Sequence, residues 1–417
     1  MSRRPTRAPG RPAPRNAVLL AGLAFSVILV ATAVAIALSR GSGHTGRQPT
    51  PSARRSAASV RQAGVPSAAA SGTHHHATRS QAGHGPTAAA GRLSIAQQVG
   101  QLIVATYAGT TPPASILTAI RDGQIGGVIL MGDNTGDSVS LTAAATSQLQ
   151  QAAASGGNPR LLIMSDQEGG QVKRLPGWPD RPAADMTTPA LARHEGFETA
   201  TMLHKAGVNM DLAPVADVAR TDGFIAHDQR AFGPDPVTVK RGACAFAAGL
   251  ARGGVAYTLK HFPGLGDALL STDNAPVSVA ESSTDLSADA SAYRTCGHGP
   301  LAVVMVSSAS YPSLTGSVPA VLSPSIYRTV MPEDGINALT ISDAFPSPAI
   351  KPWSTPARRA IGAGLDMVMY PNYEANALVA YKGLLADARA GSLSRSRVVA
   401  AASRVLTLKH ALGLGVP

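Results

Sequence analysis

From residue 93 onward, short apolar runs alternate with longer amphipathic or alanine-rich stretches. Eight such runs recur, beginning at Leu102, Gly126, Leu161, Val208, Val255, Leu301, Ala338 and Asp366. Near-continuous apolar strands separated by helix-length segments are typical of a parallel sheet that is buried on both faces. The pattern therefore predicts an α/β fold in which residues 93–417 form a single (β/α)8 barrel.

Polar residues collect at the carboxyl ends of these predicted strands. They are Asp166, Glu168, Asp211, Asp217, Lys260, His261, Ser307, Ser308, Asp343 and Tyr370. Barrel enzymes build their active sites from this end of the strands, so the set predicts one shared pocket. For any single member, capping of the following helix is an alternative explanation.

The N-terminal part of the chain has a different character. Residues 17–38 form an uncharged run of 22 residues, and a helix of that length spans the roughly 30 Å hydrocarbon core of a bilayer. We interpret the run as a transmembrane anchor after a basic cytoplasmic tail at residues 1–16, because signal-peptide cores usually have only ~7–15 residues. A cleaved signal peptide is the alternative. Either interpretation exports the predicted barrel, as a single-pass membrane protein or as a secreted one.

Residues 39–92 are rich in Gly, Ser, Ala, Thr, Pro and Arg, a composition typical of a disordered linker. The formal net charge of +11 comes from the N-terminal part, because residues 1–91 contain eleven arginines and no Lys, Asp or Glu. The predicted barrel is formally neutral, so the charge gives no reason to expect a nucleic-acid partner. Three adjacent histidines, His74 to His76, lie in the predicted linker and form no preorganised metal site. We therefore expect no metal and no cofactor.

Cys244 and Cys296 are the only cysteines in the chain. Export would permit them to form a disulfide. Two small buried apolar side chains are the alternative.

Five segments carry a resemblance to a known family. They are "DQEGGQVKRL" at 166–175, "APVADV" at 213–218, "QRAFGPDP" at 229–236, "KHFPGLGD" at 260–267 and "ISDAF" at 341–345. In this order they resemble the motifs of glycoside hydrolase family 3, in particular its single-domain bacterial β-N-acetylglucosaminidase (β-N-acetylhexosaminidase) branch. The resemblance covers roughly residues 93–414.

The resemblance implies roles for individual residues. Asp166, Arg230, Lys260 and His261 match the family's sugar contacts, and Asp343 matches its catalytic nucleophile. Few, well-placed polar groups on a rigid rim suit a small, neutral, hydroxyl-rich carbohydrate such as an N-acetylglucosamine-type glycoside. Two structural alternatives remain open: Arg230 could pair with Asp235, and His261 could be a hydrogen-bonded core histidine.

The sequence departs from the branch at its acid/base group, which is a histidine held by an aspartate two residues earlier. Without gaps, these positions fall on Asp273 and Ser271, and Leu265 replaces a further histidine. Because a carboxylic acid performs proton transfer in most glycosidases, Asp273 is our candidate acid/base, ahead of Asp267. We expect an exported, exo-acting, retaining β-glycosidase that acts on amino sugars derived from peptidoglycan or related glycosides. The alternative is a catalytically silent, membrane-tethered sugar-binding relative.

Overall fold

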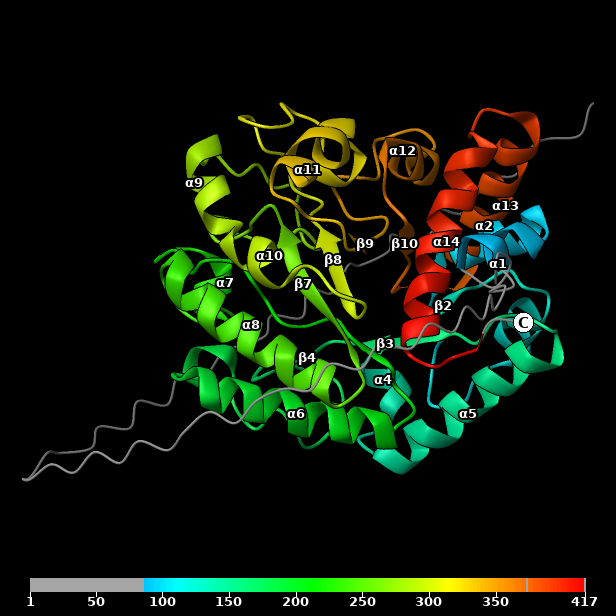
Figure 1. The fold of residues 1–417 in the computed structure, drawn as a ribbon, viewed down its shortest axis with the longest axis horizontal. Coiled ribbons are helices and arrows are strands. Elements are labelled where there is room, and N and C mark those ends of the chain that lie inside the picture. Colours follow the sequence, from blue (N-terminus) through cyan, green and yellow to red (C-terminus); the bar gives the residue numbers. More distant parts are fainter. Residues whose placement is uncertain (1–85, 373, 416–417) are drawn as a thin grey trace, which may run out of the picture. The chain divides into compact units, whose positions relative to one another are not determined.

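The computed structural model describes residues 86–372 and 374–415. These residues contain a closed barrel of parallel strands in the order β1, β10, β9, β8, β7, β6, β3, β2. The strands are β1 (Ile103–Ala105), β2 (Gly127–Leu130), β3 (Leu162–Ser165), β6 (Met210–Asp211), β7 (Ala256–Phe262), β8 (Ala302–Val306), β9 (Leu339–Ala344) and β10 (Met367–Met369). Each of the eight apolar runs contributes one strand, which confirms the predicted barrel (Figure 1).

A short antiparallel hairpin, β4 (Gln167–Gly169) and β5 (Val172–Lys173), follows β3. The helices are α1 (Pro86–Arg92), α2 (Ile95–Gln101), α3 (Ala114–Arg121), α4 (Gly132–Thr135), α5 (Val139–Ser155), α6 (Pro189–Lys205), α7 (Phe224–His227), α8 (Pro236–Arg252), α9 (Ser283–Asp289), α10 (Ser291–Cys296), α11 (Met331–Glu333), α12 (Pro356–Ala363), α13 (Glu374–Ala390) and α14 (Arg395–Ala411). Short 3-10 turns cover Ala183–Asp185 and Ala320–Leu322, and a π-helical turn covers Ile326–Val330.

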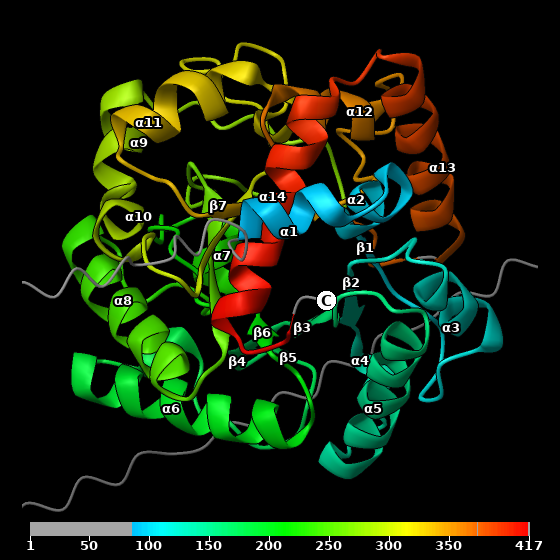
Figure 2. The same cartoon turned by 45° about the vertical axis from the view of Figure 1, so that its right-hand side comes forward.

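Local sequence explains where the long crossover helices begin. The side chains of Ser138, Thr188 and Asp235 accept hydrogen bonds from first-turn N–H groups of α5, α6 and α8. Pro189 and Pro236 occupy the first position of α6 and α8, where a missing N–H costs nothing. Figure 2 shows these helices lying outside the strands.

The interior of the barrel is filled by side chains from all eight strands. The buried set is Val104, Ile129, Leu162, Met164, Met210, Leu212, Ala256, Val303, Met305, Leu339, Ile341, Met367 and Met369, together with Val405 and Leu408 of α14. Helix α14 therefore covers the end of the barrel opposite the carboxyl ends of its strands. The interior is a packed core, and ligands have access only from the other end.

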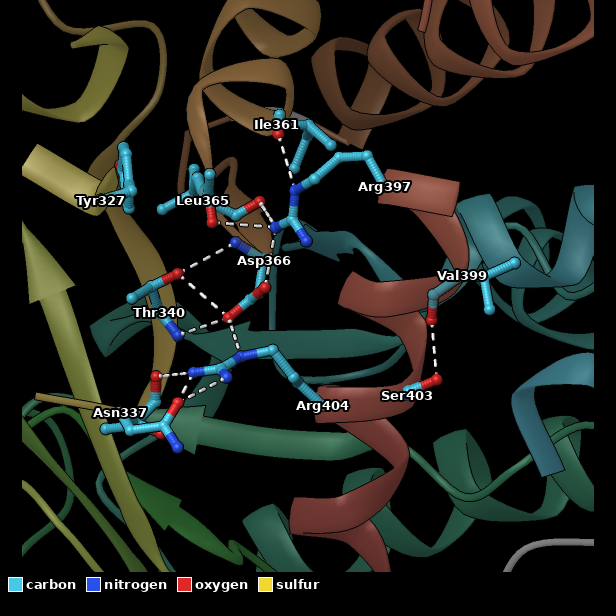
Figure 3. A network of polar contacts seen from close by, with 12 residues as sticks. Tyr327, Asn337, Thr340, Ile361, Leu365, Asp366, Arg397, Val399, Ser403 and Arg404 are labelled. Carbon is cyan, nitrogen blue, oxygen red and sulfur yellow. Dashed lines mark hydrogen bonds and ion pairs between the residues drawn. The ribbon is translucent and has the colours of Figure 1, made fainter. Parts of the chain in front are cut away.

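A polar network fixes α14 at this position, as Figure 3 shows. Asp366, which immediately precedes β10, accepts hydrogen bonds from Arg397 and Arg404 of α14, each at 2.8 Å. Its Oδ2 also accepts the N–H and the hydroxyl of Thr340 at 3.0 and 3.1 Å. Arg404 additionally donates to the carbonyl of Ala338, just before β9. One buried carboxylate thus connects the last described helix to two strands.

Helix α1 lies within the segment that we expected to be a linker. Its Ala89 and Ala90 are 4% and 0% exposed and belong to the outer core, where α1 packs against α14. Alanines are small enough to pack closely between helices, so a segment without large apolar residues is nevertheless ordered. The folded part therefore begins at least as early as Pro86, and the predicted boundary at residue 93 is too late.

The proposed anchor at residues 17–38 lies outside the described residues, as do the tail and most of the linker. Among the helices of residues 86–372 and 374–415, none has the length and hydrophobicity required to cross a membrane.

Cys244 and Cys296 form a disulfide, with their Cα atoms 5.6 Å apart. Cys244 lies in α8 and Cys296 ends α10, so the bond joins two helices on the outside of the barrel. Of the two interpretations of the cysteines, the structure contains the bonded one.

Candidate active site

A pocket of about 330 Å³ opens at the carboxyl ends of the barrel strands. All the candidate catalytic and sugar-binding residues line it: Asp166, Arg230, Lys260, His261, Asp273 and Asp343. Glu168 and Arg174 line it as well. A larger cavity of about 500 Å³ lies elsewhere, beside α6 and α8, but no carboxylate lines it. The chemistry is therefore concentrated in the smaller pocket.

Other polar residues at the strand ends do not line this pocket. They are Asp211, Asp217, Ser307, Ser308 and Tyr370. Asp267, the second candidate for the acid/base, is exposed and does not line it either. Tyr370 instead faces a separate apolar pocket between α12 and α13. Of the polar residues at the predicted strand ends, Asp166, Glu168, Lys260, His261 and Asp343 thus share one pocket and the others do not.

Lys260 stands at the centre of a charged cluster on one wall. Its ammonium group lies 2.7 Å from Asp166 and 2.6 Å from Glu168. Arg230 donates two hydrogen bonds of 2.8 Å to the same Glu168 carboxylate. Arg174 lies 3.8 Å from Asp166. The cluster fixes three cations and two carboxylates on a rigid frame before any ligand binds.

Glu168 is the member of this cluster to which sequence reasoning assigned no role. Burial on its own would raise its pKa, but Arg230 and Lys260 outweigh burial and lower the pKa to about 2. Burial likewise opposes the charge on Lys260, while Asp166 and Glu168 together raise its pKa. A signal was present in the sequence: residues two apart on an extended chain share a face, so Glu168 should accompany Asp166.

Arg230 does not pair with Asp235, so that alternative is wrong. Asp235 instead caps α8 by accepting the N–H groups of Val237 and Thr238 at 3.0 Å. The guanidinium group of Arg230 is held in the pocket wall by Glu168.

His261 is held by a buried aspartate behind the pocket. Its Nδ1 lies 2.8 Å from Oδ2 of Asp217, and its backbone N–H donates to Oδ1 of the same carboxylate at 3.1 Å. The N–H of Leu265 donates to that oxygen at 2.8 Å. Asp217 therefore orients the ring so that Nε2 is left for the pocket, and it also fixes the start of the following loop. His261 is both hydrogen-bonded within the core and part of the pocket.

Asp211 lies beneath the charged cluster at the end of β6. Its Oδ1 accepts the N–H of Gln167 at 3.0 Å. Burial raises its pKa well above the usual range, against the opposing attraction of Lys260. The ammonium group of Lys260 pairs instead with the two carboxylates that line the pocket.

Asp343 lies at the end of β9 and is 8% exposed. Its Oδ1 accepts the N–H of Ala344 at 2.8 Å, and its Oδ2 accepts the hydroxyl of Thr272 at 2.9 Å. These two hydrogen bonds fix the orientation of the carboxylate at the pocket.

Asp273 is the acid/base candidate from the sequence. It is exposed, lies on the loop after β7 and lines the pocket. Partial desolvation raises its pKa, and the negative charge of Asp343 raises it further, against the attraction of His261. Ser271 contacts Asp273 through a long hydrogen bond of 3.4 Å.

Apolar side chains line the pocket as well. They are Ile129, Met131, Met305, Met369, Pro346 and Pro371, and Ser347 and Asn372 lie among the lining residues too. In the described part of the chain no cluster of His, Cys, Asp and Glu could hold a metal ion. A lining of charged and apolar groups together suits a ligand that has both hydroxyl groups and an apolar substituent.

Comparisons with known proteins agree with this geometry. The model of the glycosyl hydrolase family 3 N terminal domain matches residues 94–408. An uncharacterized secreted glycosyl hydrolase of Arthroderma benhamiae is 31% identical over 336 residues, which cover 77% of this chain and 94% of that protein. The beta-hexosaminidase LpqI of Mycobacterium tuberculosis is 30% identical over 338 residues, which cover 76% of this chain and 83% of that protein.

Among solved structures, the beta-N-acetylhexosaminidase of Beutenbergia cavernae superposes with a TM-score of 0.70 at 32% identity, covering 76% of this chain and 99% of that one. The ordered motifs, the barrel and the extent of the match lead to the same conclusion. The chain belongs to glycosyl hydrolase family 3 and is a β-hexosaminidase-like glycoside hydrolase.

Proposed function

We propose that this protein is an exported, retaining, exo-acting β-N-acetylhexosaminidase that removes terminal amino sugars from cell-wall-derived or related glycosides. Asp343 is the nucleophile and Asp273 the acid/base. Asp166, Arg230, Lys260 and His261 bind the hydroxyl groups of the sugar. The observation that carries the proposal is that both carboxyl groups line one pocket, Asp343 with two donors to its carboxylate and Asp273 with a raised pKa.

In the first step a carboxylate oxygen of Asp343 forms a bond to the anomeric carbon while the bond to the leaving oxygen breaks. Asp273 delivers its proton to that oxygen. In the second step water attacks the anomeric carbon, Asp273 takes its proton, and the ester bond to Asp343 breaks. The sugar leaves with its original anomeric configuration, because each step inverts it.

The environment of Asp273 suits both halves of this cycle. While Asp343 is ionised, its charge helps Asp273 to retain the proton that the leaving group needs. Formation of the ester removes that charge, so the pKa of Asp273 falls and its carboxylate becomes available as a base. A carboxyl group can therefore replace the imidazole of the relatives without any further change in the mechanism.

The apolar part of the lining supports an N-acetylated substrate. Met131, Met305 and Met369 line the pocket together with the charged cluster. Methionine side chains provide adaptable apolar contact that suits the methyl of an acetamido group. The names of the related beta-hexosaminidases point to the same sugar. Export is supported by the apolar run at residues 17–38 and by the relative that is named as secreted.

A panel of aryl β-glycosides tests the proposal with purified full-length protein. We expect cleavage of the 4-nitrophenyl N-acetylglucosaminide in preference to the glucoside, with NMR showing the β-anomer of the sugar as the first product. A first product in the α configuration would overturn the retaining mechanism. A protein that binds N-acetylglucosamine but cleaves no activated glycoside would overturn the hydrolase proposal in favour of a silent sugar-binding relative, which the loss of the histidine at position 273 also suggests.

A further inference from the structure

The loop between β7 and α9 carries one buried side chain near its middle. Within residues 269–278, Thr272 is the only buried residue, at 3% exposure. Its neighbours Leu269 and Leu270 are 68% and 58% exposed. The hydroxyl group of Thr272 donates to Oδ2 of Asp343 at 2.9 Å. This part of the loop is attached at its far end by the N–H of Ser310, which donates to the carbonyl of Val277 at 3.0 Å, and near its middle directly to the proposed nucleophile.

The residues around Thr272 form a tight turn. The N–H groups of Asn274 and Ala275 both donate to the carbonyl of Ser271, at 3.0 and 3.3 Å. The N–H of Asp273 donates to the hydroxyl of Ser271 at 3.2 Å. Because the turn is closed by these bonds, fixing Thr272 also fixes Asp273, the next residue along the chain.

We propose that Thr272 is a positioning residue that joins the two halves of the reaction. Its hydroxyl orients the carboxylate of Asp343 for attack and at the same time holds the loop so that Asp273 stays over the same pocket. The inference rests on the proposed function, since it assigns Thr272 a task between the proposed nucleophile and the proposed acid/base. None of the motifs by which the sequence resembles its family includes this residue.

The hydroxyl has a consequence for Asp343 that packing alone would not have. Its hydrogen bond limits rotation of the carboxylate, which has to meet the anomeric carbon in line with the leaving group. The methyl group of Thr272 contributes only packing. Valine therefore keeps the shape and removes the hydroxyl, whereas serine keeps the hydroxyl and removes the methyl.

The test compares T272V and T272S with the wild type in the full-length protein. We expect kcat/KM of T272V to fall about 10- to 100-fold on an activated aryl N-acetylglucosaminide, the loss that follows from removing one hydrogen bond to a charged group. The loss should fall mainly on kcat, because the hydroxyl orients the attacking carboxylate rather than the sugar. T272S should retain most of the activity.

Thermal unfolding of each variant shows whether it is folded. A wild-type kcat and kcat/KM in T272V would overturn the role of Thr272 and leave the proposed function standing. Equal losses in T272S and T272V would assign the effect to packing and overturn it too. An inactive wild-type protein would overturn the proposed function itself, and with it the role of Thr272 in the reaction.

Discussion

The ammonium group of Lys260 and the carboxylate of Glu168 lie 2.6 Å apart at the base of the pocket, and both side chains are almost fully buried. Glu168 is also the partner of Arg230. One carboxylate therefore positions two of the cations proposed to bind the sugar. Its influence on activity should exceed that of a surface ion pair, because removing one member of a buried cluster leaves the others uncompensated.

Glu168→Gln should accordingly weaken substrate binding. The amide keeps the size of the side chain but no longer balances Lys260 and Arg230, so we expect kcat/KM to fall by about 10- to 100-fold, mainly through KM. Steady-state kinetics on an aryl N-acetylglucosaminide measure this. Asp235→Asn is the matched control, because Asp235 caps α8 outside the pocket, and its kinetics should not change. Unchanged kinetics in Glu168→Gln would show that Lys260 and Arg230 do not need the Glu168 carboxylate to hold their positions.

Asp343→Ala should abolish turnover of every glycoside, whatever its leaving group. Without the carboxylate the covalent intermediate cannot form. The measurement is hydrolysis of aryl glycosides over a range of leaving-group pKa values. Residual turnover that varies with the leaving group would contradict the role of Asp343 as nucleophile.

Asp273→Ala should discriminate between leaving groups. A nitrophenolate departs without a proton, so the first step should survive on aryl substrates, whereas a disaccharide should lose about 10²- to 10⁴-fold in rate. Azide needs no general base and should restore turnover of the trapped intermediate. Asp267→Ala, on the same loop but outside the pocket, serves as the control. Equal effects of Asp273→Ala on both substrate types would remove Asp273 from the acid/base role.

Asp366→Ala should destabilise the fold strongly. The change leaves Arg397 and Arg404 without their shared carboxylate, and loss of one partner from a buried ion pair costs about 3–5 kcal/mol. Glu198→Ala provides the contrast, since its contact with His194 is exposed and 3.9 Å long, and exposed pairs contribute about 0–1 kcal/mol. Urea unfolding of the two variants checks the difference. Similar losses in both would mean that α14 is held by apolar packing alone.

The buried Lys409 should make stability depend on pH. Burial lowers its pKa to about 7, while an unfolded lysine titrates near ~10.4. Between these values the unfolded chain binds more protons than the native one, so stability should rise with pH by up to about 1.4 kcal/mol per unit. Below the lower value both states are charged and this dependence disappears.

Urea unfolding between pH 7 and 9 measures the effect of Lys409. Lys409→Met should reduce the rise in the free energy of unfolding with pH, because methionine does not titrate. Lys205→Met, an exposed lysine in the last turn of α6, should leave the slope unchanged. If the free energy of unfolding of Lys409→Met still rises with pH as in the wild type, another group causes the pH dependence.

The disulfide should stabilise the barrel by closing a loop whose two cysteines are 52 positions apart in the chain. Closing a loop of that length removes about 4 kcal/mol of chain entropy from the unfolded state. The double variant Cys244→Ser, Cys296→Ser should lose a comparable amount in chemical unfolding. Adding a reductant should lower the stability of the wild type and leave that of the variant unchanged. Two free thiols in oxidised, denatured wild-type protein would rule out the bond.

The barrel was readable from sequence because its strands are buried on both faces. Each strand is an almost uninterrupted apolar run, and a motif residue such as Asp166 or Lys260 follows where the run ends. A motif residue at the end of an apolar run is therefore predicted to lie at the pocket end of the barrel. The same pattern assigns too many residues to the pocket, because it cannot distinguish a side chain that lines the pocket from one that points elsewhere. Asp217 and Tyr370 are examples of side chains that point elsewhere.

Thr272 shows what the sequence could not reveal. Its only notable contact is with Asp343, a residue 71 positions away, and nothing in the composition of its loop distinguishes it from Ser271. Helix α1 is a different case. Its alanines carry too little apolar surface to predict a helix, and they are ordered because α14 provides a close-fitting surface. Both features depend on a partner that only the folded chain brings near.

Helix α14 supplies Val405 and Leu408 to the core inside the barrel. The order of synthesis therefore determines how long the barrel interior stays uncovered. A ribosome delivers all eight strands before it delivers the helix that covers their interior, so a growing or stalled chain presents an open ring of methionines and leucines to its surroundings. Such surfaces attract chaperones and other unfolded chains. Until α14 is synthesised and packs there, these apolar side chains lack the cover that they have in the folded protein.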